Sequence, residues 1–202
     1  TVEANRGTIY DSTGTPLALS ATVYNVQLSP KEIIQCQKEY QEKVENALKN
    51  DKDPPDYPEP TAQFIAENLA EILDLEVDDI LARLAKENSL YEMIKWRVEA
   101  EESDAVQAFI TENHISGIYL MPTSKRYYPK GSLAAQVIGW FNPNVGEGAY
   151  GVEALYEEEL SGETGRVVTA KNGVGTEMMF DYEQIFDAEN GNSLVLTLDM
   201  EV

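Results

Sequence analysis

The spacing of hydrophobic positions changes twice along this chain of 202 residues. In residues 6–29, apolar and polar side chains alternate on either side of a cluster of turn-forming residues, a pattern typical of strands. In residues 30–116, apolar positions recur at helical spacing. Strand-like runs return from residue 117 onward. The pattern therefore predicts an α+β fold in which residues 1–29 and 117–202 form a β-rich base and residues 30–116 form an inserted, mostly helical lobe.

The inserted lobe is predicted to hold a series of helices. The first fills most of residues 30–50 and ends at a proline-rich break, because proline removes a backbone donor and restricts its neighbour. Thr61 is placed to cap the second helix. Ser89 and Glu92 form a capping-box pattern, so a further helix is expected through Val98. The apolar stripes behind the other helices are Ile65, Leu69, Ile72 and Leu73; Val77, Ile80, Leu81 and Leu84; and Val106, Phe109 and Ile110.

In the β-rich base, short helices are expected between strands. One helix is predicted within residues 133–140 and another over residues 151–160, where Gly162 provides a C-terminal stop. Asn172-Gly173 is a strong signal for a two-residue hairpin turn. A last strand is expected over residues 193–199.

Composition and charge narrow the classes of partner. The chain carries 36 acidic and 15 basic residues, a formal net charge of −21, so its surface repels nucleic-acid phosphates and anionic lipid. No apolar run approaches the roughly twenty residues that span a bilayer, and the chain is expected to be part of a longer protein. Cys36 is the only cysteine, which excludes an internal disulfide and a cysteine-based metal cluster. We expect no cofactor, no metal and no nucleic acid.

Four blocks of sequence are more specific than the composition. They are Arg6-Gly7-Thr8-Ile9-Tyr10-Asp11 with Gly14 and Leu17-Ala18, then Arg126-Tyr127-Tyr128-Pro129, then Gly148 to Gly165, and finally Asn190 to Asp199. In this order they resemble the non-catalytic N-terminal module of class B penicillin-binding proteins, of the division or sporulation type of Gram-positive bacteria. Ser12 stands where arginine is common in that family. The residues expected to form its structural motif are Arg6, Gly7, Asp11, Gly14, Arg126, Pro129, Gly148, Gly151, Glu153, Gly162 and Gly165.

The resemblance implies that the chain is the pedestal, also called the dimerisation domain, of a serine-type D,D-transpeptidase that cross-links peptidoglycan. The transpeptidase domain would lie outside this chain, which would not itself be an enzyme. The implied partners are the transpeptidase domain of the same polypeptide, a SEDS-family glycosyltransferase and other cell-wall machinery, and a homodimer is also implied as possible. The parent would lie on the extracytoplasmic face of the cell membrane, anchored by one transmembrane helix that this chain does not contain.

The residues themselves suggest no catalytic set. None of the serines has a lysine three positions later, as the Ser-x-x-Lys nucleophile of penicillin-recognising enzymes requires. His114, the only histidine, is expected at the end of a helix instead of in a catalytic triad. Glu153 and Glu157 share a helix face and could form an acid–base pair, but a solvent-exposed acidic face explains Glu157 equally well. Residues 51–56 resemble a calcium loop that lacks its glycine and final glutamate.

The charged residues of the blocks suggest a structural role. Arg6 and Arg126 are expected to pair with Asp11 or Glu153 and so to join distant segments of the base. Independent, solvated charges are the alternative. Two other functions stay open: a free-standing secreted module that binds glycan or peptide, and a carbohydrate-active enzyme that uses Glu153.

Overall fold

The computed structural model describes residues 4–132, 134–169, 183–186 and 188–199. The chain divides into two compact units, one formed by residues 1–22 with 124–202 and one by residues 23–123. We call them the terminal unit and the central unit. The structure contains both helices and strands, as predicted, which confirms the α+β class. The predicted division into base and lobe at residues 29/30 and 116/117 remains a prediction.

A five-stranded sheet has the order β3-β2-β1-β9, with β4 paired to β2 outside this path. β2, Pro16–Leu28, pairs antiparallel with β1, Ile9–Tyr10, and with β3, Glu92–Val98. β4, Ile118–Tyr127, also pairs with β2, and β1 pairs in parallel with β9, Leu194–Val195. The strand predicted over residues 193–199 is therefore present only in part.

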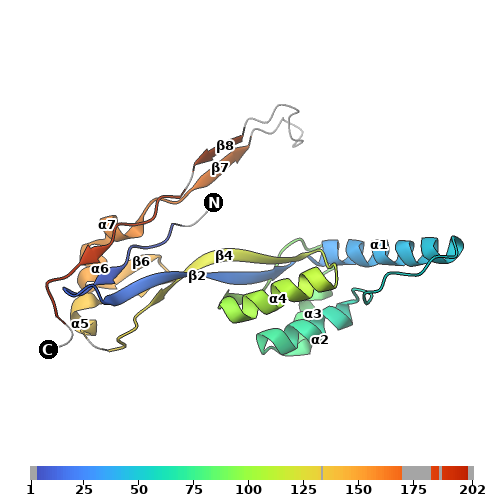
Figure 1. Ribbon diagram of the computed structural model, residues 1–202, viewed down its shortest axis with the longest axis horizontal. Coiled ribbons are helices and arrows are strands. Elements are labelled where there is room, and N and C mark those ends of the chain that lie inside the picture. Colours follow the sequence, from blue (N-terminus) through green and yellow to red (C-terminus); the bar gives the residue numbers. More distant parts are fainter. Residues whose placement is uncertain (1–3, 133, 170–182, 187, 200–202) are drawn as a thin grey trace. The chain divides into compact units, whose positions relative to one another are not determined.

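The central unit holds four helices: α1, Pro30–Lys49; α2, Ala62–Leu73; α3, Val77–Leu84; and α4, Ala100–Glu112. In Figure 1, α2, α3 and α4 lie together beside the strands, whereas α1 extends away from them. The predicted Thr61 cap is confirmed, because its Oγ1 accepts a hydrogen bond from the Phe64 amide at 3.1 Å. Among the described helices, none is both long enough and apolar enough to cross a membrane. The largest fully buried side chains of this unit are Val23, Val26, Leu28, Ile65, Leu69, Leu73, Ile80 and Val98.

The helix predicted from the Ser89 capping box is wrong, because these residues form strand β3. Ile94 and Val98 are buried, whereas Trp96 between them is 63% exposed. The register between β2 and β3 shifts at two places, and Arg97 has a positive φ of 53°. Such a bulge interrupts the two-residue alternation of a strand. In the sequence, Ile94, Trp96 and Val98 alternate with Lys95 and Arg97 at the two-residue period of a strand, and the capping-box pattern was the misleading signal.

The terminal unit is built from short elements. Its helices are α5, Ala135–Ile138; α6, Gly151–Leu155; and α7, Glu157–Ser161. Its further strands are β5, Trp140–Asn142; β6, Glu147–Tyr150; β7, Arg166–Thr169; and β8, Glu183–Phe186. The helix predicted within residues 133–140 is confirmed as α5, and the helix predicted over residues 151–160 is divided into α6 and α7 by Tyr156. β7 and β8 pair antiparallel, and the Asn172-Gly173 turn lies outside the described residues.

Candidate functional site

Glu153, in the first turn of α6, is the centre of a buried group of charged residues in the terminal unit. Its side chain is 0% exposed. Its Oε2 lies 2.7 Å from Nε of Arg6, and its Oε1 lies 2.9 Å from Nε of Arg126. The hydroxyl of Tyr128 donates to Oε1 at 3.1 Å. Together with Glu157, we call these residues the Arg–Glu cluster.

Arg6 connects both carboxylates of the cluster. Its Nη1 and Nη2 donate to the two oxygens of Glu157 at 2.8 and 2.7 Å, a bidentate pair. Nη2 also donates to the backbone carbonyl of Glu153 at 2.7 Å. The guanidinium lies over the ring of Phe141, 5.2 Å from its centre. Arg6 therefore fixes the position of α6 and α7 relative to the N-terminal segment of the same unit.

Arg126, near the end of β4, binds the backbone of the N-terminal segment. Its side chain is 3% exposed, and its Nη1 donates to the carbonyl of Gly7 at 2.7 Å and to the hydroxyl of Ser20 at 3.1 Å. Its Nη2 is buried without a hydrogen-bond partner among the described residues. Within that same part of the chain, Glu153 is the only carboxylate in ion-pair contact with Arg126. Arg126 thus depends on Glu153 for compensation of its charge.

Tyr128 links the cluster to the hairpin of β5 and β6. Its hydroxyl donates to Glu153 and accepts a hydrogen bond from the amide of Phe141 at 2.7 Å. A second link comes from the Gly148 amide, which donates to Oε2 of Glu157 at 2.7 Å. The hairpin is therefore attached to the cluster by one hydrogen bond from each of its strands.

The charges of the cluster balance, with two arginines and two glutamates. Burial alone raises the pKa of Glu157, but hydrogen bonds from Arg6 and the Gly148 amide outweigh it, so the pKa is lowered. Burial lowers the pKa of Arg6, but the hydrogen bonds to Glu157 and Glu153 outweigh it and raise the pKa. Burial and the charge of Glu153 raise the pKa of Tyr128 to about 12. At neutral pH, Arg6 and Glu157 are charged and Tyr128 is protonated.

The sequence predicted that Arg6 and Arg126 pair with either Asp11 or Glu153. In the structure, both arginines contact Glu153. Sequence reasoning missed the roles of Glu157 and Tyr128. The expectation of a solvent-exposed Glu157 is wrong, since its side chain is 26% exposed and is held by Arg6. The spacing of four residues from Glu153, which places both carboxylates on one helix face, was the signal available in the sequence.

The other motif residues occupy turns and close backbone contacts. Asp11 is buried, and its Oδ1 accepts hydrogen bonds from the amides of Thr13 and Thr15 in a turn where Gly14 has a φ of 87°. A Cβ at Gly7 would lie 1.9 Å from the carbonyl oxygen of Asn192. The remaining residues are Gly148 against the Glu153 backbone, Gly151 at the start of α6, Gly162 at the end of α7 with a φ of 71°, buried Gly165, and exposed Pro129 after β4.

The geometry of Glu153 does not suit an acid–base catalyst. Its carboxylate is inaccessible, and both oxygens accept hydrogen bonds from arginines. A general acid or base has to reach the proton of a substrate within hydrogen-bond distance. The described residues also contain no cluster of three or more histidine, cysteine, aspartate or glutamate side chains suited to a metal ion. The hydrogen bonds of the cluster hold segments of the backbone together, which is a structural role.

Comparison with known proteins identifies the family. A family model described as the penicillin-binding protein dimerisation domain matches residues 1–196. The chain belongs to this family. It is 30% identical over 203 residues to the probable peptidoglycan D,D-transpeptidase PenA of Neisseria meningitidis serogroup A, covering 100% of this chain and 30% of that protein. It is 25% identical over 224 residues to the peptidoglycan D,D-transpeptidase MrdA of Escherichia coli K12, covering 100% of this chain and 31% of that protein.

Solved structures share the fold. Penicillin-binding protein 2X of Streptococcus thermophilus matches with a TM-score of 0.63 and 22% identity, over 95% of this chain and 28% of that chain. Penicillin-binding protein PBP2 of Helicobacter pylori, solved in complex with MreC, matches with a TM-score of 0.60 and 22% identity, over 98% of this chain and 35% of that chain. The chain thus spans about a third of the length of the curated relatives it matches and covers their dimerisation part.

Proposed function

We propose that this dimerisation domain is the non-catalytic pedestal of a peptidoglycan D,D-transpeptidase. It positions the catalytic domain of the same polypeptide outside the membrane and offers surfaces to other components of cell-wall synthesis. The observation that carries the proposal is the Arg–Glu cluster, in which two arginines and two glutamates tie together segments far apart in the sequence. The matched relatives, named D,D-transpeptidases, support the choice of enzyme.

The contacts of β9 explain how the cluster could set the direction of the chain. The amide of Leu194 donates to the carbonyl of Thr8 at 2.8 Å, and the amide of Asn192 donates to the carbonyl of Glu159 at 2.7 Å. The Gly7 amide in turn donates to the carbonyl of Leu160 at 2.9 Å. The segment around β9 is therefore fixed to the same backbone that Arg6 and Arg126 hold. A rigid base of this kind would orient a domain that follows β9.

The finer parts of the proposal concern the parent protein and its partners. We assign the parent to the division or sporulation type of Gram-positive bacteria on its helical insertion, residues 30–116, although PenA and MrdA come from Gram-negative species. A SEDS-family glycosyltransferase, other cell-wall machinery and a second copy of the chain are the proposed partners. The Helicobacter pylori PBP2, which contains this fold, was solved in complex with MreC, and this supports partner docking by a protein that contains such a domain. The parent would be anchored in the membrane and would act on its extracytoplasmic face.

The test uses the full-length parent protein in its own cell. Glu153→Gln should impair cell-wall synthesis in vivo while the purified protein still reacts with a fluorescent penicillin, because the cluster lies outside the catalytic domain. The matched control is Glu158→Gln, the same chemical change at an exposed position of α7, and it should behave as wild type. Normal growth of the Glu153→Gln strain would refute the pedestal role. The binding-module alternative is tested separately by titrating the chain with muropeptides, for which the pedestal predicts no saturable binding.

A further inference from the structure

One edge of the sheet, in the terminal unit, carries backbone groups that have no hydrogen-bond partner in the described part of the chain. β9 and the residues after it bind the N-terminal segment through the amides of Leu194 and Leu196 and the carbonyl of Leu198, at 2.8, 2.9 and 2.7 Å. In an extended chain, the amide and carbonyl groups of successive residues point to opposite edges. The residues whose backbone groups point away from β1 are therefore Ser193, Val195 and Thr197. All three are exposed, Val195 at 70%, and we call them the β9 edge.

β3, at the other end of the strand order, is protected against pairing with a further strand. Three of its seven residues are charged, and Arg97 has a φ of 53° where the pairing with β2 is irregular. The carbonyl of Met93 accepts a hydrogen bond from Arg83 of α3. Charged side chains, bulges and covering groups keep an exposed edge from binding another strand. By contrast, residues 190–198 contain neither a charged residue nor proline, so the β9 edge is open to a further strand.

The sequence of the β9 edge matches itself in reverse order. Around its central residue it reads Ser193-Leu194-Val195-Leu196-Thr197. When two copies run antiparallel about a two-fold axis at Val195, valine lies opposite valine, leucine opposite leucine and serine opposite threonine. Pairs of β-branched residues and of hydroxyl residues in such positions stabilise neighbouring strands. The outward backbone groups of one copy then face those of the other and can form hydrogen-bonded pairs.

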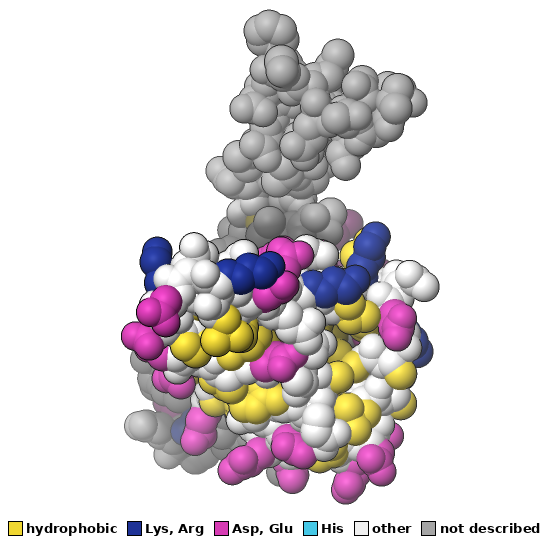
Figure 2. Space-filling model, turned by 90° about the vertical axis from the view of Figure 1, so that its right-hand side faces the viewer, with side chains coloured by type: hydrophobic (Ala, Val, Ile, Leu, Met, Phe, Trp, Pro, Cys, Tyr) yellow, Lys and Arg dark blue, Asp and Glu magenta, His cyan; other side chains and the backbone are white. Residues whose placement is uncertain are grey.

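Charge limits where two copies of the chain can meet. Each copy has a formal net charge of −21, and acidic side chains are spread over the face shown in Figure 2, so such surfaces repel each other. The β9 edge avoids this repulsion, because its uncharged run places Asp199 opposite Gly191 of the second copy and puts no two like charges of the described residues opposite each other. The edge is short, so the contact that it makes is weak and depends on protein concentration.

We propose that the β9 edge joins two copies of this chain by antiparallel strand pairing about Val195. The outward amide and carbonyl groups of the edge supply the hydrogen bonds, and the symmetric order of its side chains sets the register. This pairing rests on the proposed partnership with a second copy of the chain. The pedestal role of the Arg–Glu cluster does not depend on it and is tested separately by Glu153→Gln, so a failure of one can be told from a failure of the other.

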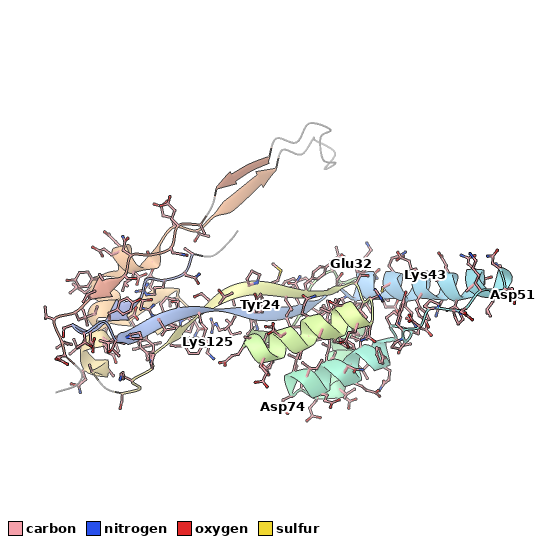
Figure 3. All side chains as sticks on the ribbon, viewed as in Figure 1. Tyr24, Glu32, Lys43, Asp51, Asp74 and Lys125 are labelled. Carbon is pink, nitrogen blue, oxygen red and sulfur yellow. The ribbon has the colours of Figure 1, made fainter. Side chains whose placement is uncertain are left out.

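Disulfide cross-linking of the whole chain tests the pairing and its register. In a Cys36→Ser background, which removes the only native thiol, Val195→Cys places two cysteines opposite each other at a Cα separation of about 5.5 Å, within the range of a disulfide. We expect a disulfide-linked dimer on mild oxidation. Thr197→Cys should not form one alone, because its two cysteines are about 13 Å apart along the strands, but it should cross-link when mixed with Ser193→Cys. Lys43→Cys, on α1 in Figure 3, is the control for random collisions.

Sedimentation equilibrium measures the pairing without a cross-link. We expect a dimer whose association constant is about threefold or more larger at about 0.5 M than at about 0.05 M NaCl, since salt screens the repulsion between the two acidic chains. Val195→Lys should abolish the dimer, because it puts two lysines opposite each other. It also reduces the net negative charge, so the loss cannot come from greater repulsion between the chains. Circular dichroism checks that the variant is folded.

Three results would overturn the proposal. The first is a wild-type chain that stays monomeric up to about 1 mM, the weak end of measurable affinities. The second is equal cross-linking of Val195→Cys, Thr197→Cys and Lys43→Cys, which would show that no register is preferred. The third is unchanged dimerisation of Val195→Lys, which would place the contact on another surface.

Discussion

Replacing Glu153 by glutamine tests the role of the Arg–Glu cluster most directly. The substitution keeps the shape of the side chain, so it creates no cavity, but it removes the negative charge shared by Arg6 and Arg126. The amide oxygen of glutamine can accept from one arginine. Its amide nitrogen is a donor and then faces the donors of the other arginine or of Tyr128.

The size of the effect follows from what each arginine retains. Arg6 keeps its bidentate pair with Glu157 and so remains compensated. Arg126 loses the one carboxylate that the described residues place against it, and its side chain is only 3% exposed. Removing one partner of a buried ion pair costs about 3–5 kcal/mol. With a urea m-value of about 2 kcal/mol/M, the unfolding midpoint should fall by about 1.5–2.5 M.

The two tryptophans make the assay specific for one unit. Trp140 belongs to the terminal unit and Trp96 to the central unit, where it is 63% exposed, so we expect Trp96→Phe to leave the fold intact. In a Trp96→Phe background, urea unfolding followed by fluorescence reports the terminal unit through Trp140. The exposed control Glu158→Gln should change the free energy of unfolding by less than about 0.5 kcal/mol. A change as small as this for Glu153→Gln would refute the reasoning.

Three further predictions concern the same unit. The pKa of Glu157 is lowered on folding, so its contribution to the free energy of unfolding is complete above the unfolded pKa of about 4.3 and is lost as the pH falls through the folded pKa. Urea unfolding from pH 3 to 7 should therefore show the stabilities of wild type and Glu157→Gln converging at the acid end. The pKa of Tyr128 is raised to about 12, so its contribution is complete below pH 10 and is lost as the pH rises through about 12. Absorbance at 295 nm should show a tyrosine titrating near pH 12 in the wild type that is absent from Tyr128→Phe. Gly7→Ala places a Cβ 1.9 Å from a backbone oxygen, so it should destabilise the unit by about 1–3 kcal/mol, more than Gly14→Ala, which has open space but a φ of 87°; urea unfolding of the two variants gives the order.

The helices of the central unit could be predicted from the sequence because tertiary packing agrees with their local pattern. In α2, the stripe of Ile65, Leu69 and Leu73 is buried, and the hydroxyl of Thr61 caps the first turn of the helix. β3 has a strand pattern in the sequence, since Ile94, Trp96 and Val98 alternate with Lys95 and Arg97, but the capping-box pattern of Ser89 and Glu92 favoured a helix. Its bulge could not be predicted. Bulges depend on the pairing with another strand, and a single sequence does not contain that pairing.

The cluster could be predicted only in part, for an equally physical reason. The pairing of Arg6 and Arg126 with a carboxylate follows from the block pattern, but two acceptors, Asp11 and Glu153, were equally compatible with it. Asp11 accepts hydrogen bonds from the turn two to four residues ahead, a local role that its neighbours Thr13 and Thr15 already indicate. Glu153 has no such local partner among the described residues, since the hydrogen bonds to its carboxylate come from Arg6, Arg126 and Tyr128 in distant segments.

The Arg–Glu cluster is buried and has no net charge, although the chain is strongly acidic. Its role is better explained by the orientation of backbone segments than by a gain in stability. Buried ion pairs can often be replaced by hydrophobic residues of similar volume without loss of stability, because desolvation offsets their attraction. A hydrophobic replacement could not donate to the carbonyls of Gly7 and Glu153, as Arg126 and Arg6 do at 2.7 Å. Those directional bonds to the backbone fix how β4, α6 and the N-terminal segment meet, and a pedestal depends on that geometry. Two of the 15 basic residues are used in this way in a chain with a net charge of −21, which is consistent with selection for orientation.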